Sequence, residues 1–231
     1  VVQQVTCSGA CDGSIALNTQ GGTPNYQYTW SPVPSNGQGS NSATGLCPGP
    51  WSVTIADANG CDTTLQFTIT EPAPLTSVPT VGVSQCLLCN GSITLSTAGG
   101  TAGYTYIWGA PLNITTNNPI QANLCAGLYP VVVQDAAGCS LPLVVPVTDS
   151  DGEVLTITDG LTSCPNVCDG LVVVDFACGV PNCSVQWIDG LGTVLPVTSD
   201  TLSGLCVGNY FVQVTNGEGC ISIDTCLLYT S

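Results

Sequence analysis

Basic side chains are missing from this sequence. The 231 residues contain no Lys, Arg, His or Met, whereas Asp and Glu number 15 and set the formal charge at −15. Nucleic-acid binding depends on Lys and Arg contacts to phosphate, so we expect no nucleic-acid partner. Anionic membranes are disfavoured for the same reason, and cations are the charge-matched partners.

Long apolar runs are also missing, and helical periodicity with caps is not found. A membrane-spanning helix needs about 18 or more consecutive apolar residues, so we predict no membrane insertion. The sequence starts at Val1 without an initiator methionine or a signal peptide. We interpret it as an internal part of a longer protein.

The usual catalytic constellations cannot be built from these residues. Without His and Lys, Ser-His and Ser-Lys nucleophile systems are excluded. The acidic residues are scattered at turns, where local hydrogen bonding favours Asp. No glycine-rich loop lies between a strand and a helix, as nucleotide binding requires. We therefore predict a protein that is not an enzyme and has no cofactor other than the calcium considered below.

Cysteine, glycine and proline are abundant by contrast. The chain has 15 Cys, 27 Gly and 16 Pro, and 44% of its residues are hydrophobic. That apolar content is enough to bury real cores, so disorder is not expected. So many cysteines indicate an oxidising setting, and we predict an extracellular or cell-surface location.

Three internal repeats organise the sequence. Cys11, Trp30 and Cys61 each recur 78 positions later, as Cys89, Trp108 and Cys139. A third, more diverged copy carries small insertions. We place the repeats at residues 1–73, 74–150 and 151–225. The corresponding segments are "CDGSIAL", "CNGSITL" and "CDGLVVV"; "YQYTW", "YTYIW" and "CSVQW"; and "DANGC", "DAAGC" and "NGEGC".

Short alternating runs broken by Gly, Pro, Asn and Asp are typical of strands and turns. The fold class is therefore predicted as all-β, with three tandem immunoglobulin-like antiparallel β-sandwich modules stapled by disulfides. Trp30, Trp108 and Trp187 would lie on a central strand and pack the cores. In the first repeat, strands are expected near Val1–Cys7, Gly13–Thr19, Tyr26–Ser31, Ser42–Leu46, Trp51–Asp57 and Asp62–Thr70.

The order of these motifs resembles the SprB-type repeat of giant cell-surface adhesins of gliding Bacteroidetes, and more broadly the PKD-like sandwiches. The pattern of that family runs through "DGSI", "GGT", "YxYxW", "L..G.Y.V.V.D..GC" and "TITEP", and the match covers nearly all of the first two repeats. It is looser in the third, where "FACGVPNC" replaces the "GGT" turn. The resemblance implies secreted, surface-attached repeats, exported in many cases by the type IX pathway, without an active site.

The cysteines allow a disulfide scheme to be chosen by geometry. Cys47 and Cys61 bracket a predicted strand and should lie roughly 20 Å apart, whereas a disulfide needs Cα atoms within about 7 Å. We choose the two nested pairs Cys7–Cys61 and Cys11–Cys47 over the swapped assignment, because Cys7 precedes Cys11 on a predicted strand that runs toward the Cys47 end. By analogy we predict Cys86–Cys139, Cys89–Cys125, Cys164–Cys220 and Cys168–Cys206, with Cys178–Cys183 stapling their own loop. Four cysteines permit three connectivities, so this scheme is a hypothesis.

Two metal sites are considered. Cys7/Cys11 and Cys86/Cys89 have zinc-like spacing, but the extracellular context and the absence of His favour disulfides. Asp149, Asp151 and Glu153 gather three carboxylates between the second and third repeats, and hard oxygen ligands suit calcium. A solvated acidic linker is the alternative that we favour there.

The last six residues, "CLLYTS", are unlike the ends of the other repeats. One reading frame of a common transposase sequencing adapter encodes these residues. We interpret residues 226–231 as adapter read-through; a native free or interchain Cys226 is the alternative.

These features predict a non-catalytic repeat segment of a secreted or surface-anchored adhesin. It would act as a stalk or spacer with weak surface adhesion, of the gliding-motility type that the resemblance implies. Its partners would be an extracellular surface, a glycan or neighbouring repeats of the same protein. The alternative is a carbohydrate-binding β-sandwich array that presents exposed aromatic residues, for which Tyr26, Tyr28 and Tyr104 are the candidates.

Overall fold

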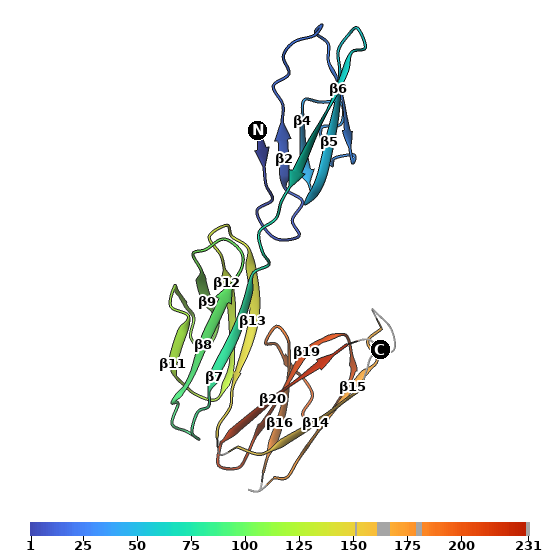
Figure 1. Cartoon of the computed structure of the whole chain (residues 1–231). Coiled ribbons are helices and arrows are strands. Elements are labelled where there is room, and N and C mark those ends of the chain that lie inside the picture. The colour runs from blue at the N-terminus through green and yellow to red at the C-terminus, as the bar shows by residue number, and fades with distance from the viewer. Residues whose placement is uncertain (151, 161–166, 179–181, 230–231) are drawn as a thin grey trace. The chain divides into compact units, whose positions relative to one another are not determined.

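The computed structural model describes residues 1–150, 152–160, 167–178 and 182–229, and every regular element in these ranges is a β-strand (Figure 1). None of these ranges contains a helix long and apolar enough to cross a membrane. The strands form six antiparallel sheets, two in each repeat.

The first repeat is a sandwich of two three-stranded sheets, in the orders β1-β2-β4 and β3-β5-β6. Its core contains Ile15, Trp30 and Val53, which come from both sheets and are at most 1% exposed. The strands are β1 (Val2–Gln3), β2 (Gly13–Ala16), β3 (Gln27–Ser31), β4 (Ser42–Leu46), β5 (Gly49–Ala56) and β6 (Asp62–Ile69).

The second repeat has sheets in the orders β11-β8-β7 and β10-β9-β12-β13. Ile93 of one sheet and Trp108 and Val131 of the other meet in its core. The strands are β7 (Thr76–Gly82), β8 (Gly91–Ala98), β9 (Thr105–Trp108), β10 (Ile114–Thr116), β11 (Ile120–Leu124), β12 (Gly127–Gln134) and β13 (Ser140–Val147).

The third repeat follows the second, with sheets in the orders β14-β15-β18 and β17-β16-β19-β20. Val172, Trp187 and Val212 lie at the centre of its core. The strands are β14 (Leu155–Gly160), β15 (Gly170–Phe176), β16 (Ser184–Asp189), β17 (Val194–Leu195), β18 (Thr201–Leu205), β19 (Gly208–Thr215) and β20 (Ile221–Leu228).

All three repeats share one topology. If the seven strands of the second and third repeats are lettered A to G in chain order, each repeat pairs A-B-E in one sheet and D-C-F-G in the other. The first repeat has the same arrangement without D, so its strands β1 to β6 are A, B, C, E, F and G. Two antiparallel sheets connected in this way form an immunoglobulin-like sandwich. The predicted fold class is confirmed.

Two predicted strands of the first repeat are too long. β2 ends at Ala16 rather than Thr19, and β1 covers Val2–Gln3 rather than Val1–Cys7. The chain turns after β1 because the carboxylate of Asp12 accepts hydrogen bonds from the backbone N–H and the hydroxyl of Thr6. These bonds replace the ladder that a longer strand would form.

A tryptophan on strand C lies at the centre of each core, as predicted. Trp30, Trp108 and Trp187 are 1%, 2% and 0% exposed. The indole N–H groups of Trp30 and Trp187 donate hydrogen bonds to the carbonyls of Ser40 and Ser199, at 2.9 and 2.8 Å. The indole N–H of Trp108 is buried without a hydrogen-bond partner among the described residues.

A second aromatic residue closes the corner between strands E and F. In each repeat the third residue of strand F donates a hydrogen bond to a backbone carbonyl four residues upstream, as the tyrosine corner of immunoglobulin-like domains does. Because that carbonyl belongs to a disulfide-bonded cysteine, the corner and the staple support each other. The bonds are Trp51 to Cys47 at 2.9 Å, Tyr129 to Cys125 at 2.8 Å and Tyr210 to Cys206 at 3.2 Å.

The chain divides into two compact units that do not coincide with the repeats. The first unit is Val1–Thr76 with Ala98–Gly103 and Asp135–Cys139, and the second is Ser77–Thr97, Tyr104–Gln134 and Ser140–Ser231. The first unit therefore contains two turns of the second repeat. The boundaries at residues 73/74 and 150/151 stay predictions, although each repeat builds its own sheets and core.

The end of β20 includes residues from the terminal segment. Cys226 and Leu228 are 3% and 1% exposed and pack in the third core. In the pairing with β19, Leu228 lies opposite Gly208, as Ile69 lies opposite Gly49 in the first repeat. The read-through interpretation of residues 226–231 stays a prediction.

Candidate functional site at the repeat junctions

The recurring cysteine turn joins strands F and G at one end of each sandwich. In the first repeat, Oδ1 of Asp57 accepts hydrogen bonds from the backbone N–H groups of Asn59 and Cys61, both at 2.9 Å. Asp135 holds Ala137 and Cys139 in the same way, at 2.9 and 2.8 Å. Asn216 does so for Glu218 and Cys220, both at 3.0 Å. This shared Asx turn presents the three cysteines in equivalent positions.

The "GGT" motif supports the turn in the first two repeats. Oδ2 of Asp135 accepts a hydrogen bond from the Thr101 N–H at 2.7 Å, and Asp57 accepts the equivalent bond from Thr23 at 3.0 Å. Gly100 has φ of +59°, and a Cβ there would lie 2.4 Å from Oδ2 of Asp135. Only glycine permits this approach without strain.

These hydrogen bonds keep the turn carboxylates ionised. The N–H groups of Thr23 and Cys61 lower the pKa of Asp57 below its usual value. Burial raises the pKa of Asp135, but the bonds from Thr101, Cys139, Ala137 and Gly138 outweigh burial and the pKa is lowered. A general acid needs the opposite shift, so these carboxylates are suited to holding the turn.

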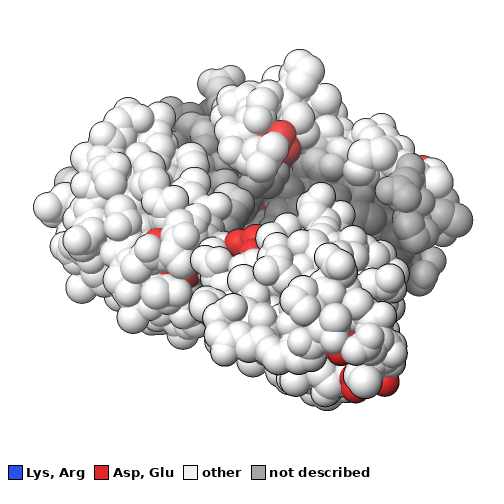
Figure 2. Space-filling view, turned by 90° about the horizontal axis from the view of Figure 1, so that it is seen from above, with Lys and Arg blue, Asp and Glu red and all other residues white. Residues whose placement is uncertain are grey.

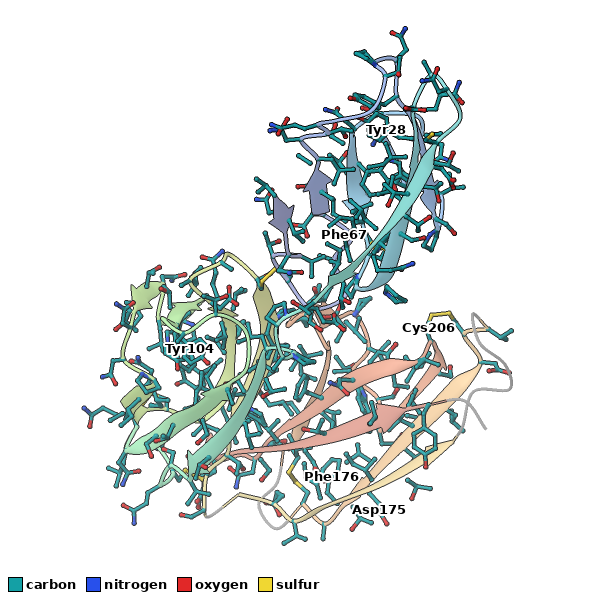
Figure 3. All side chains as sticks on the ribbon, turned by 45° about the horizontal axis from the view of Figure 1, so that its top comes forward. Tyr28, Phe67, Tyr104, Asp175, Phe176 and Cys206 are labelled. Atoms are coloured by element: carbon teal, nitrogen blue, oxygen red, sulfur yellow. A yellow bond between two sulfur atoms is a disulfide. The ribbon has the colours of Figure 1, made fainter. Side chains whose placement is uncertain are left out.

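Four disulfides lie within repeats, as predicted. One in each repeat joins the end of the A–B loop to the residue after strand E, and the fourth closes the loop before strand C of the third repeat. Figure 3 shows the bond at Cys206. The pairs and their Cα separations are Cys11–Cys47 at 3.9 Å, Cys89–Cys125 at 3.7 Å, Cys168–Cys206 at 3.9 Å and Cys178–Cys183 at 6.1 Å.

Two further disulfides join successive repeats. Cys7 is bonded to Cys139, with Cα atoms 5.7 Å apart, and Cys86 to Cys220, with Cα atoms 5.0 Å apart. Both separations are within the usual range for disulfides. In each case the A–B loop of one repeat is bonded to the F–G turn of the next.

The predicted pairs Cys7–Cys61, Cys86–Cys139 and Cys164–Cys220 are therefore wrong. Cys7 and Cys61 lie at opposite ends of the first sandwich. Thr70, just after β6, donates a hydrogen bond to the side chain of Gln4, which places the Cys7 loop near the end of β6. Cys61 precedes β6, whose eight residues span about 26 Å. Cys164 lies outside the described residues.

The signal that could have identified this arrangement is the strand length already used to reject Cys47–Cys61. A first strand that runs toward Cys47 also runs away from Cys61. Two cysteines at opposite ends of a repeat can pair only with those of neighbouring repeats. The predicted scheme missed this arrangement because it paired all cysteines within their own repeats.

Backbone hydrogen bonds reinforce the junction between the second and third repeats. The N–H of Asp149 donates to the carbonyl of Ile221, and the N–H of Ile221 donates to Oδ2 of Asp149, both at 2.9 Å. Thr148 Oγ1 lies 3.3 Å from the same carbonyl. Ser84 and Asp149 form a parallel bridge. The linker thus bonds to the start of β20, next to Cys220.

The candidate calcium ligands are only partly brought together. Asp149 is 7% exposed and directs Oδ2 at Ile221, whereas Oδ1 is buried without a hydrogen-bond partner among the described residues. Glu153 is half-buried. Asp151 lies outside the described residues, and in the remainder no group of three potential metal ligands is found. The calcium site stays a prediction.

The junction within the first unit uses the linker between the first two repeats. The carboxylate of Glu71 accepts a hydrogen bond from the Gly9 N–H at 2.6 Å and holds the linker against the A–B loop of Cys7. The N–H of Gly100 donates to the carbonyl of Ala73 at 2.8 Å. The linker therefore lies on the turn that precedes strand C of the second repeat. The role of Glu71 and the "GG" turn in docking was not predicted from the sequence.

The tyrosines considered for sugar binding do not form an exposed aromatic surface. Tyr26 and Tyr28 are half-buried and pack against the first core, and Tyr104 packs against the second. Figure 3 shows Tyr28 and Phe67 among the side chains of the first sandwich. On the face shown in Figure 2, acidic residues are scattered rather than gathered in one patch.

A family model described as the SprB repeat matches residues 1–35 and 86–111. These segments include the A–B loops, with Cys7, Cys11, Cys86 and Cys89, and the strand C tryptophans of the first two repeats. The two matched segments lie in the first and the second repeat. No curated protein matches the sequence.

Several solved immunoglobulin-domain proteins align with the chain at low similarity. The N-terminal eight Ig domains of Down Syndrome Cell Adhesion Molecule are 13% identical, with 96% of this chain and 34% of that chain covered and a TM-score of 0.29. Murine CEACAM1b is 11% identical, with 68% and 100% covered and a TM-score of 0.27. The fold assignment rests on the sheet topology above, because TM-scores this low carry no argument.

Proposed function

We propose that this chain is a non-catalytic stretch of repeats from a secreted or surface-anchored adhesin, where it forms a stalk. The observation that carries the proposal is the covalent linkage of successive repeats through Cys7–Cys139 and Cys86–Cys220. A chain cross-linked from repeat to repeat transmits force through disulfides rather than through hydrogen bonds alone. That property suits a spacer that holds its outer end away from a cell.

Composition supports the same function. Without Lys or Arg the chain offers no cleavage site for trypsin-like proteases. The six disulfides among the described residues limit the unfolding that would expose other sites. A sandwich of this size buries a limited core, so staples contribute much of its stability. Persistence outside the cell follows from both features.

The SprB-repeat match supports a finer assignment to surface adhesins of the gliding-motility type. In that role the stalk contacts an extracellular surface weakly along its length or associates with neighbouring repeats. The carbohydrate-binding alternative needs exposed aromatic residues, and the half-buried Tyr26, Tyr28 and Tyr104 do not favour it.

Surface labelling tests the proposal. Antibodies raised against the purified chain should label intact cells that carry the gene, and deletion of the gene should remove the label and weaken attachment to a surface. Antibodies against a cytoplasmic protein serve as the control and should label only permeabilised cells. Labelling of permeabilised cells alone would contradict the proposal.

A glycan array distinguishes the two functions. A stalk should give no signal above that of the same chain after reduction and alkylation. A defined sugar ligand, lost when Tyr26 is changed to Ala, would instead favour the carbohydrate-binding array.

A further inference from the structure

We propose that Cys61 is a third junction cysteine and forms a disulfide with the A–B-loop cysteine of another repeat of this kind, supplied by a second copy of the chain. The first repeat would thereby accept a repeat docked on its F–G turn, just as the second and third repeats do. The inference rests on the proposed stalk function only in requiring an oxidising setting.

Equivalence of the three turns is the first observation. Cys61, Cys139 and Cys220 follow an Asp or Asn that holds the turn through two backbone hydrogen bonds of 2.8 to 3.0 Å. Cys139 and Cys220 are bonded to the A–B loops of the preceding repeats. Cys61 has the same geometry, but its side chain is exposed and its thiol is free.

The neighbouring glycine turn provides an independent observation. In the second repeat this turn is occupied by the linker of the preceding repeat. The N–H of Gly100 donates to the Ala73 carbonyl at 2.8 Å, and a Cβ on Gly99 would lie 1.9 Å from the Pro74 carbonyl oxygen. In the first repeat the equivalent Gly21 has no atom within 4 Å of its Cβ position.

That open position borders a surface hollow next to the free thiol. Gly21, Gly22 and Tyr26 line the hollow together with Cys61. A docking surface that is filled in one repeat is thus present and open in another. Its occupant is expected to be the linker of a second SprB-type repeat, with that repeat's A–B-loop cysteine beside Cys61.

The bond would form by thiol–disulfide exchange with a small-molecule disulfide such as oxidised glutathione. The thiolate of Cys61 attacks one sulfur of that disulfide and releases one glutathione thiolate. The thiolate of the partner cysteine then attacks the Cys61 sulfur and releases the second. Two protein thiols are oxidised to one disulfide, one small disulfide is reduced to two thiols, and the two protons pass to the released thiolates.

The full chain contains the second cysteine needed for the test. By sequence, Cys164 occupies the A–B-loop position of Cys7 and Cys86 in the third repeat; its structure lies outside the described residues. The variant Cys61→Ser retains Cys164, and the variant Cys164→Ser retains Cys61. In a glutathione redox buffer each variant alone should stay monomeric, and their mixture should yield a disulfide-linked dimer at least tenfold above either alone.

A displaced thiol controls for random oxidation. The variant Cys61→Ser/Cys164→Ser/Thr63→Cys carries an exposed thiol two residues away from position 61. This variant and the Cys164→Ser chain are each mixed with the Cys61→Ser chain. The Thr63→Cys variant should form the linked dimer at least tenfold more slowly than the Cys164→Ser chain does. Cys226→Ser should leave linkage by the otherwise unchanged chain unaltered. Peptide mapping with a protease that cleaves at Asp should find Cys61 joined to Cys164 of another chain.

Equal rates for the two thiols, the absence of dimer from the mixture, or a Cys61–Cys164 bond within one chain would each overturn the inference. Surface labelling of cells is unaffected by any of these outcomes. Failure of this inference is therefore distinguishable from failure of the proposed function.

Discussion

Extension under force is the property that the two inter-repeat disulfides control most directly. Consider the oxidised chain pulled from its two ends until every sandwich is unfolded. Disulfides remain closed, so the chain can extend only along its shortest covalent path. That path crosses Cys7–Cys139, Cys125–Cys89 and Cys86–Cys220 and follows the backbone between them.

The length of this path follows from the residue numbers. It contains roughly 35 residues, which extend to about 130 Å with the three cross-links included, whereas the fully reduced chain extends to about 790 Å. The double variant Cys86→Ser/Cys220→Ser reroutes the path through Cys168–Cys206. Roughly 60 residues are then in line, and the limit rises to about 210 Å.

Single-molecule force spectroscopy with handles at both termini measures these limits. The oxidised chain should stop near 130 Å, the double variant near 210 Å, and reductant should release the full length. The double variant Cys178→Ser/Cys183→Ser is the matched control. It removes a disulfide that lies off the path, and its limit should equal that of the unmodified chain.

A limit near 240 Å for the unmodified chain would refute this reasoning. About 67 residues would then be in line, as expected if each repeat were closed on itself by Cys7–Cys61, Cys86–Cys139 and Cys164–Cys220. A limit that did not change with Cys86→Ser/Cys220→Ser would equally show that this bond carries no force.

Four further predictions concern stability. In urea unfolding, Trp187→Phe should lower the free energy of unfolding by about 1 kcal/mol more than Trp108→Phe does, because of these two indoles only that of Trp187 donates a hydrogen bond. Equal losses would contradict this. Gly100→Ala should lower the melting temperature through strain at φ +59° and contact with Asp135, and an unchanged value would argue against that approach. The pKa of Asp135 is lowered from 3.8, so its carboxylate stabilises the fold above pH 3.8, and this stabilisation is lost as the pH falls through the lower pKa of the folded state. Asp135→Ala should therefore reduce the loss of unfolding free energy at acidic pH. An unchanged pH dependence would exclude this role. If calcium binds at the second linker, it should raise the melting temperature, and Asp149→Asn should remove the effect; no rise with calcium would leave the acidic linker as the better interpretation.

Much of the fold was predictable because it depends on local patterns. Alternating residues such as those of Gly49–Ala56, with every second side chain buried from Trp51 onward, identify a strand with one face in a core. The 78-residue shift identifies the repeats. The tryptophans of strand C are buried, as large apolar side chains on a central strand are expected to be. The short first strand was harder to predict, since its end depends on the bond between Thr6 and Asp12 across a turn.

The junctions were less predictable because they depend on which ends of the sandwiches meet. The disulfide Cys11–Cys47 lies within one repeat and joins the ends of the paired strands β2 and β4, so the topology of that repeat alone brings the two cysteines together. The Cys86–Cys220 bond joins residues 134 positions apart in different modules. No periodicity within a repeat contains that information.

Residue patterns alone indicate a set of disulfide-stapled β-sandwich repeats with no basic residue, a tryptophan in each core and a cysteine at each F–G turn. The pairing of those turn cysteines depends instead on how the sandwiches fold. A disulfide forms between atoms a few ångströms apart, and distance across a module is set by strand direction and length rather than by proximity in sequence. The eight-residue β6 separates Cys61 from Cys7, so Cys7 bonds to Cys139 in the turn of the next repeat instead of closing its own repeat.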